Sequence, residues 1–335
     1  MISLAEKYLL LFSLPLYTVI ILFEVLMSNW HMKAFYSVKE TIMNVYMTLV
    51  NSTVDLVFRG VYLVVLFLAY EYRFLEAPQQ PFLYWGVLFV LEDLAFYVVH
   101  RVDHSSRIFW AVHVTHHSSP EFNLSTGFRS SVLQPLYRFV YFIPIVFLGF
   151  HPIDILFMFS LTQVYGVLVH TQYIQKMPAW FESVFVSPSH HRVHHASNIL
   201  YLDKNMGMVL IIWDKLFGTF QAEVEEEPVK FGITTMPQHP FHPVKSITHE
   251  FSNIIRDVSK TTNLHHKLNF VFKSPGWSPD GTTKTSRELQ RELATKSSSV
   301  VDHPTSEEYA TASIETILAS SSAFWKFENV WTLKG

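Results

Sequence analysis

Three long apolar runs near the start of the sequence limit the possible folds of this chain more than any other feature. Residues 8–27, 54–70 and 82–99 are each nearly continuous apolar sequence, about the length that a helix needs to cross a bilayer. The first run could be mistaken for a signal peptide, but no small-residue cleavage site follows it, so we expect a membrane anchor. The sequence therefore predicts an all-α fold, a multi-pass transmembrane helical bundle.

The composition supports one membrane-embedded unit. Of the 335 residues, 49% are hydrophobic and only 16% are charged, whereas about 25% are charged in ordinary soluble domains. The formal net charge of −3 gives no basic surface for nucleic acid, and nucleic acid is not expected as a partner. The chain has no cysteine, which excludes disulfides, thiolate metal ligands and cysteine nucleophiles.

Two shorter apolar runs complete the predicted bundle. Residues 139–150 and 153–169 are separated by His151 and Pro152, and they predict a hairpin that enters the bilayer and returns. The loop between the second and third long runs contains one basic residue, Arg73. The basic residues that follow the first and third runs are Lys33, Lys39, Arg101, Arg107, Arg129 and Arg138. The positive-inside rule then places the sequence after residue 99 on the cytoplasmic side.

Histidines provide the candidate site. Eleven of the 18 histidines lie between residues 100 and 195. Eight of them form three spaced groups, which are His100 and His104; His113, His116 and His117; and His191, His194 and His195. Because helix positions i, i+3 and i+4 share a face, each triplet is predicted to point three imidazoles at one spot. Imidazole suits zinc, iron, copper and nickel.

The alternative to a metal site is a structural role. A lone histidine is usually structural, and a single HxxxH pair arises by chance. Burying so many unpaired polar rings would be costly, however, so we interpret the groups as metal ligands. Eight converging imidazoles are too many for a four-coordinate structural zinc and suit two metal ions that share one pocket.

Three nearby residues have less certain roles. Asp93 lies seven residues before His100, two helical turns back on the same face, where a buried acid could accept the second ring N–H of a ligand. The alternative is that Asp93 pairs with Arg101 or a lysine. His170 follows the predicted hairpin and is a candidate ninth ligand. His190 should point about 100° away from His191 on a helix, so we do not assign it as a ligand.

A metal pair at the cytoplasmic end of a membrane bundle suggests oxygen chemistry on a lipid whose alkyl chain enters from the bilayer. A membrane metal transporter or sensor is the alternative of another class. Transporters usually place ionisable ligands within the span, near its midplane, whereas these motifs follow the apolar runs. Imidazole ligands alone do not distinguish iron from zinc.

The spacing HxxxH, HxxHH and HxxHH in a membrane context resembles the fatty acid hydroxylase/sterol desaturase superfamily of non-haem di-iron enzymes. The flanking sequence is similar to one branch of that superfamily, the ether-lipid-cleaving alkylglycerol monooxygenases. The similar stretches are residues 110–119, 122–126, 187–195, 203–205 and 211–220. Carried over by position, the metal ligands would be His100, His104, His113, His116, His117, His191, His194 and His195.

The resemblance implies a monooxygenase that contains two iron ions and uses O2. It would hydroxylate the alkyl carbon beside an ether oxygen in a tetrahydrobiopterin-dependent reaction, and the product would collapse to a fatty aldehyde and a glycerol derivative. The electron donor would be the pterin or a redox protein. A sterol, sphingoid or fatty acyl hydroxylase or desaturase on the same core is the alternative. The membrane would be the endoplasmic reticulum in a eukaryote or the inner membrane in a bacterium.

These observations predict four regions. Residues 1–81 would hold the N-terminal transmembrane helices, and residues 82–235 the catalytic domain with its histidine-rich di-metal cap. Residues 236–293 would form peripheral amphipathic helices, one over residues 246–258 and one that starts at a capping box of Thr285 and Glu288 and ends at residue 293. The Ser/Thr-rich residues 294–335 are expected to be disordered.

Overall fold

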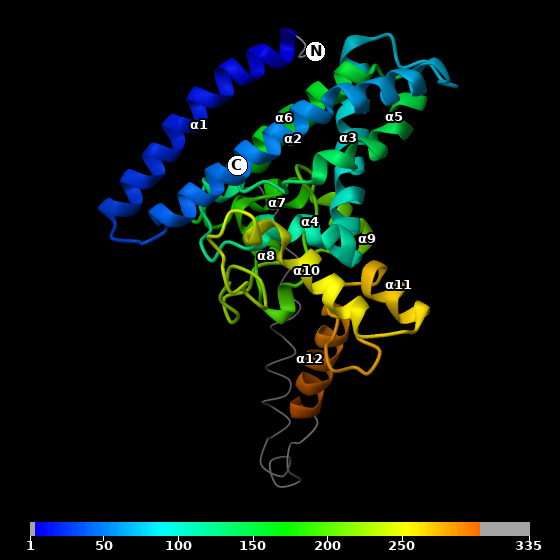
Figure 1. Cartoon of the computed structure of the whole chain (residues 1–335). Coiled ribbons are helices and arrows are strands. Elements are labelled where there is room, and N and C mark those ends of the chain that lie inside the picture. The colour runs from blue at the N-terminus through cyan, green and yellow to red at the C-terminus, as the bar shows by residue number, and fades with distance from the viewer. Residues whose placement is uncertain (1–3, 302–335) are drawn as a thin grey trace, which may run out of the picture. The chain divides into compact units, whose positions relative to one another are not determined.

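The computed structural model describes residues 4–301, and this part of the chain is helical (Figure 1). The α-helices are α1 (Leu4–Trp30), α2 (Val38–Glu71), α3 (Pro81–Ser105), α4 (Arg107–His117), α5 (Ile143–Phe147), α6 (Pro152–Leu168), α7 (Ala179–Val184), α8 (Pro188–His194), α9 (Ile212–Phe217), α10 (Lys245–Ser259), α11 (Leu264–Phe272) and α12 (Ser286–Val301). Within the described range, β pairing is limited to two isolated bridges, Phe185 with Leu210 and Ala196 with Phe231. The all-α prediction is confirmed.

The chain divides into two units, Met1–Ser286 and Arg287–Gly335. The second unit contains almost all of α12, which reaches Val301. Residues 294–301, where the sequence predicts disorder, are helical in this structure, and no proline or glycine interrupts the helix there. Residues 302–335, the rest of the predicted tail, lie outside the described residues.

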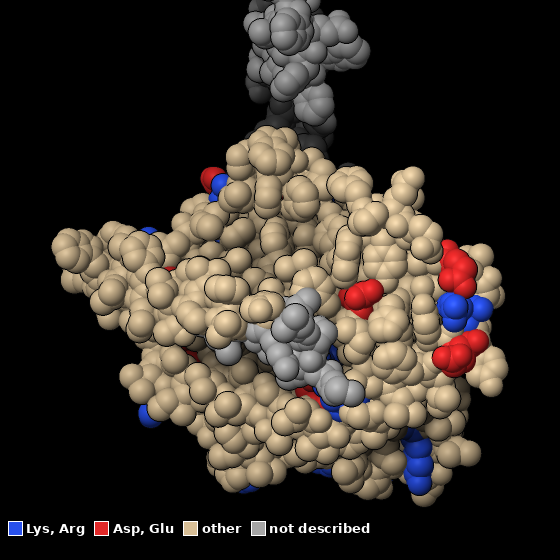
Figure 2. All heavy atoms as spheres, turned by 90° about the horizontal axis from the view of Figure 1, so that it is seen from above, with Lys and Arg blue, Asp and Glu red and all other residues tan. Residues whose placement is uncertain are grey.

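Three helices are long and apolar enough to cross a membrane, in agreement with the three predicted spans. The candidate spans are Leu11–Trp30, Val38–Glu71 and Pro81–Ser105. Large apolar side chains such as Phe12, Leu26 and Leu56 are exposed along the first two, as expected of surfaces that face lipid. Figure 2 shows the molecule from above, and few charged side chains interrupt this face. The chain is therefore a membrane protein.

The second span is longer than its apolar sequence predicts. Helix α2 begins at Val38, after an N-cap in which the hydroxyl of Ser37 accepts from the N–H of Glu40 at 3.3 Å. The first half of the helix carries polar residues that bind the protein instead of lipid. Asn44, for example, donates to Ser125 at 3.0 Å, and Asn51 donates to the carbonyl of Ser131 at 2.9 Å. These long-range partners explain why apolar periodicity missed this part of the helix.

The predicted hairpin is present. A short 3-10 helix at Arg138–Phe142 and α5 form its first arm, and α6 forms the second. The ring of His151 caps α6 by accepting from the N–H of Ile153 at 3.3 Å. Helices α2, α3, α5 and α6 share an apolar core that includes Leu66, Leu88 and Ile155. Because α6 packs on α3, it brings His170 back toward the end of α3.

Helix α10 covers the histidine-bearing helix α4, and it lies where the sequence predicts an amphipathic helix, over residues 246–258. Arg107 at the start of α4 donates from Nε to Glu250 and from Nη2 to Asp257, both at 2.8 Å. These ion pairs fix α10 against α4, while α11 packs beside both helices. Helix α10 thus covers α4, the helix that carries the third predicted ligand, His113.

Candidate metal centre

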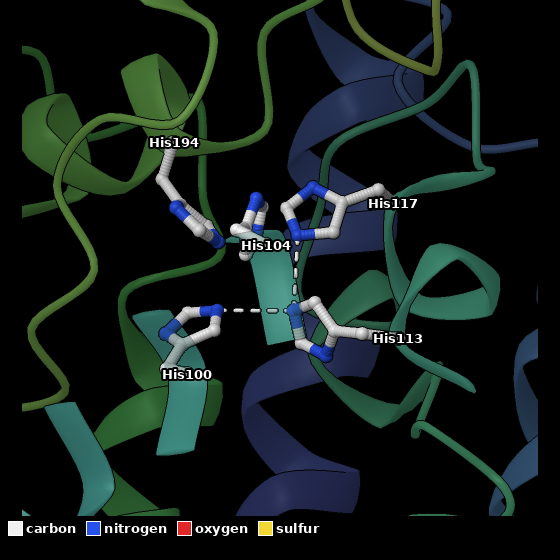
Figure 3. A group of neighbouring side chains, drawn as sticks. All are labelled: His100, His104, His113, His117 and His194. Atoms are coloured by element: carbon white, nitrogen blue, oxygen red, sulfur yellow. Dashed lines mark hydrogen bonds between the residues drawn. The ribbon is translucent and has the colours of Figure 1, made fainter. Parts of the chain in front are cut away.

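The structure brings all nine candidate histidines into two compact groups. In each group the possible ligand atoms lie within 4.8 Å of one another. The first histidine group contains His100, His104, His113, His117 and His194, and the second contains His116, His170, His191 and His195. Figure 3 shows the rings of the first group pointing toward one another, and dashed lines join His113 to His100 and to His117.

The prediction that each triplet points at one spot was wrong in detail. His113 and His117 belong to the first group, whereas His116 belongs to the second; His191 and His195 belong to the second group, whereas His194 belongs to the first. Neighbouring helix positions differ by about 100°, so His116 and His117 cannot face the same point, while residues i and i+4 differ by only about 40°. Each triplet therefore serves both groups.

The two groups adjoin and form one cluster of rings. The ring centroids of His117 and His195 lie 4.5 Å apart, as do those of His116 and His195, and those of His117 and His194 lie 4.6 Å apart. Eight of the nine rings are buried, and His116 is half-buried. The rings of both groups thus lie side by side and are largely shielded from water.

His190 lies outside both groups. Its backbone N–H donates to the hydroxyl of Ser187, and its ring Nδ1 accepts from the N–H of Ser187, both at 3.3 Å. This reciprocal pair caps the N-terminus of α8, the short helix that carries the last triplet. His190 therefore helps to cap α8, while His191 and His194 of the same helix belong to the histidine groups.

Backbone carbonyls orient four of the nine rings. The Nδ1 atoms of His100, His116, His170 and His194 face the carbonyl oxygens of Met206 at 2.7 Å, Arg129 at 2.8 Å, Gly166 at 2.7 Å and Lys204 at 2.9 Å, respectively. A carbonyl only accepts, so each Nδ1 carries the proton and each Nε2 presents a lone pair. Of the other rings, Nδ1 of His113 bonds Ser131 at 2.8 Å and Nδ1 of His104 bonds Asp203 at 3.1 Å.

The lone pairs converge where a cation would satisfy them. Nε2 of His170 presents its lone pair to the Nε2 atoms of His191, at 2.9 Å, and His195, at 3.2 Å. In the first group, the buried Nε2 atoms of His104 and His194 have no hydrogen-bond partner. Orphaned buried nitrogens are costly without a partner. The donor set therefore fits a transition-metal ion in each group.

The rings are also held in the protonation state that a metal needs. Burial lowers the pKa of the His116 imidazole to about 4. Burial likewise places the pKa of His113, His117, His170, His191, His194 and His195 well below the usual histidine range. At neutral pH these imidazoles are neutral, with a lone pair free for a metal.

Asp93 is buried on α3, but its predicted contact with His100 is absent. Its carboxylate accepts from the N–H groups of Val209 at 2.9 Å and Leu210 at 3.1 Å and from the indole of Trp213 at 2.9 Å. The segment that starts at Met206 packs against α3. Its N–H groups bond the Asp93 carboxylate, and the carbonyl of Met206 accepts from the ring of His100. The alternative of a pair with Arg101 is also wrong, since Arg101 donates to the Tyr97 hydroxyl.

Replacing Asp93 with asparagine is expected to weaken metal retention about 10–100-fold, because the segment that supports His100 would lose at least one hydrogen bond. Metal content after dialysis against a chelator measures this effect. Asp55→Asn is the matched control, since Asp55 is a carboxylate of α2 that binds Arg138 instead of the Met206 segment. Equal metal content in the Asp93→Asn and wild-type proteins would limit Asp93 to a structural role.

The sequence did not predict several residues that contact the histidine rings. The ring of Trp110 packs on His104, with centroids 5.1 Å apart, and on His117, with centroids 5.5 Å apart. The orienting groups from Met206 and Lys204 are backbone carbonyls, which any residue type could supply. Asp203 lies in the stretch 203–205, which resembles known enzymes, but the resemblance did not predict a role for this residue. Its contact with His104 spans 99 residues and follows only from the fold.

Together, the fold and the two histidine groups define a helical membrane protein with a buried, all-histidine site suited to transition metals. Residues 85–219 match the fatty acid hydroxylase family model, so this part of the chain is similar to fatty acid hydroxylases. This match confirms the resemblance drawn from the histidine spacing. No solved structure matches the chain.

Curated relatives support the same branch of that family. The chain is 38% identical over 210 residues to alkylglycerol monooxygenase of Homo sapiens. The aligned region covers 62% of this chain and 46% of the relative. It is 34% identical to alkylglycerol monooxygenase of Xenopus tropicalis, over 67% of this chain and 50% of the relative. The ornithine lipid hydroxylase OlsE of Rhizobium tropici is 28% identical over 47% of each chain. The chain spans about half the length of the relatives that it matches.

Proposed function

We propose that this chain is a membrane monooxygenase that uses O2 to hydroxylate a lipid alkyl chain, with an alkylglycerol ether lipid as substrate. The observation that carries the proposal is the pair of adjoining, buried imidazole groups within a domain whose relatives include alkylglycerol monooxygenases. Residues 82–235 would form the catalytic domain. The distribution of basic residues favours a cytoplasmic site, in the endoplasmic reticulum of a eukaryote or the inner membrane of a bacterium.

The two histidine groups would each hold one iron ion. Bound iron would supply the activation of O2 that attack on an unactivated C–H bond requires. The protein supplies neutral imidazoles, fixes their tautomers through the carbonyls of Met206, Arg129, Gly166 and Lys204, and excludes water by burial. Trp110 and Phe122 pack against the rings and limit the directions from which a substrate can approach.

The proposed reaction inserts one oxygen atom of O2 into the C–H bond beside the ether oxygen, and the second oxygen atom leaves as water. Two electrons and two protons are needed, and tetrahydrobiopterin is the proposed electron donor. The hydroxylated ether is a hemiacetal, whose C–O bond then breaks to give a fatty aldehyde and a free glycerol hydroxyl. Because the pKa of the buried imidazoles is lowered, they would stay neutral during this reaction.

A second candidate is hydroxylation or desaturation of a sterol, a sphingoid base or a fatty acyl chain on the same core. It is favoured by the similarity to an ornithine lipid hydroxylase and to a Saccharomyces cerevisiae sterol desaturase that is 29% identical over 38% of this chain. The lower identities of these relatives place it second. A metal transporter or sensor is less favoured, since eight of the nine rings are enclosed by protein.

Membranes that contain this protein are expected to convert a 1-O-alkylglycerol to a fatty aldehyde only when tetrahydrobiopterin is present. Aldehyde formation can be measured directly, with His194→Ala membranes as the control for background activity. Pterin-dependent aldehyde that is lost in the variant would support the ether-lipid reaction. The absence of aldehyde from membranes whose protein holds two irons would contradict it and favour the sterol and sphingolipid substrates.

A further inference from the structure

One short segment orients most of the first histidine group. The carbonyl oxygens of Lys204 and Met206 accept from the rings of His194 at 2.9 Å and His100 at 2.7 Å. The carboxylate of Asp203 bonds Nδ1 of His104 at 3.1 Å. Residues 203–206 thus contact three of the five rings in the first group. We call these four residues the 203–206 segment.

The rings of the second histidine group are hydrogen-bonded by other parts of the chain. The Nδ1 atoms of His116 and His170 face the carbonyls of Arg129 and Gly166. Nδ1 of His191 is buried without a hydrogen-bond partner. The two groups therefore depend on different parts of the chain for the orientation of their rings.

The backbone of the 203–206 segment adopts an unusual conformation. Asp203 and Asn205 both have φ of 54°, in the left-handed region that residues other than glycine rarely adopt. Asparagine and aspartate tolerate this region better than most residues, but it still costs about 1 kcal/mol or more for each. The two residues flank Lys204, and this winding places the carbonyls of Lys204 and Met206 where they reach two different rings. Such a conformation needs external bonds to hold it.

Asn205 provides most of those bonds. Its side-chain amide donates to the carbonyls of His190 at 3.0 Å and Gln221 at 2.8 Å, and its oxygen accepts from the N–H of Gln221 at 2.9 Å. The residue is fully buried. Asp214 adds two bonds at the other end, from the N–H groups of Met206 at 2.7 Å and Gly207 at 2.8 Å. The side chain of Asn205 is thus engaged with backbone groups and bonds no histidine ring.

We propose that Asn205 is a positioning residue that holds the 203–206 segment against the first histidine group, so that the metal in this group can be lost independently of the metal in the second. The inference rests on the proposed binding of two metal ions. It assigns Asn205 no contact with metal or substrate. Its effect on the first metal passes through the carbonyls of Lys204 and Met206 and the carboxylate of Asp203.

Asn205→Gly tests this role, because glycine keeps the left-handed backbone while removing all three side-chain bonds. Metal retention by the first group is expected to weaken about 10–100-fold, as for other residues that support a metal ligand. After dialysis against graded chelator, the purified full chain should hold about one metal ion where the wild-type holds about two. Asn198→Ala is the matched control, since Asn198 bonds Pro228 and Lys230 with a similar side-chain pattern and should keep both ions.

Double variants identify which ion is lost. Asn205→Gly combined with His170→Ala should lose both ions, because the two changes act on different groups. Asn205→Gly combined with His194→Ala should lose no more than His194→Ala alone. Full metal retention by Asn205→Gly, or equal loss of both ions from a folded Asn205→Gly protein, would overturn the inference.

The outcome is separable from that of the proposed function. A wild-type protein with two metal ions and no aldehyde formation would overturn the ether-lipid reaction while the Asn205 comparison still stands. A wild-type protein with no bound metal would overturn both. Thermal unfolding of each variant distinguishes loss of a metal from failure to fold.

Discussion

Replacing His194 with alanine is expected to abolish turnover and to remove one metal ion, and replacing His116 is expected to remove the other. His194 belongs to the first histidine group and His116 to the second. Changes to residues that merely support a ligand cost about 10–100-fold in metal affinity or activity, so loss of the ligand itself should cost at least as much. Elemental analysis of the purified variants, with aldehyde formation in membranes, measures both effects.

His265→Ala is the control for these two variants, because His265 is exposed on α11 and belongs to neither group. It should keep both metal ions and wild-type turnover. Insertion into the membrane should be unchanged in all three variants, since the substitutions leave the apolar spans intact. Wild-type activity in either His194→Ala or His116→Ala would refute the assignment of that histidine as a ligand.

The second large effect is expected at Arg129, whose side chain is buried between α2 and the histidine-bearing α4. Its guanidinium donates to Glu40 and Asn44 on α2, both at 3.0 Å, and to the carbonyl of Thr115 on α4 at 2.8 Å. Arg129→Met would leave the Glu40 carboxylate buried without its cation. Breaking a buried ion pair in this way lowers the free energy of unfolding by about 3–5 kcal/mol.

Equilibrium unfolding in detergent micelles measures this loss, and the double variant Arg129→Met/Glu40→Gln tests its cause. Removing the charge on Glu40 should restore part of the lost stability, because no unpaired charge then remains buried. The Arg129 carbonyl also orients His116, so the single variant should lose metal from the second group as it loosens. Equal stability in the wild-type and Arg129→Met proteins would show that the buried pair is unimportant.

Much of the fold could be predicted from sequence because its signals are local. The apolar runs predicted the three spans, and the runs on either side of His151 predicted the hairpin of α5 and α6. The spacing of the histidines predicted that they gather in one place. The first half of α2 was missed because Asn44 and Asn51 are polar residues whose partners lie about 80 positions away.

The arrangement within the site depended on information that spacing lacks. Helical geometry separates His116 from His117 by about 100°, but only the fold decides that each triplet contributes to both groups. The partner of His100 is the carbonyl of Met206, 106 residues away. Asp93 was correctly expected to be buried, yet its bonds go to the N–H groups of Val209 and Leu210 and to the Trp213 indole. Backbone groups leave no mark in the sequence.

The most direct test of the proposed centre is the metal content of the purified full chain. Two adjoining groups of five and four imidazoles, eight of them buried, lead us to expect about two iron ions per chain. Both ions should be lost in the combined His194→Ala/His116→Ala variant. A wild-type protein that binds a single ion, binds zinc in place of iron, or binds no metal at all would contradict the two-iron account.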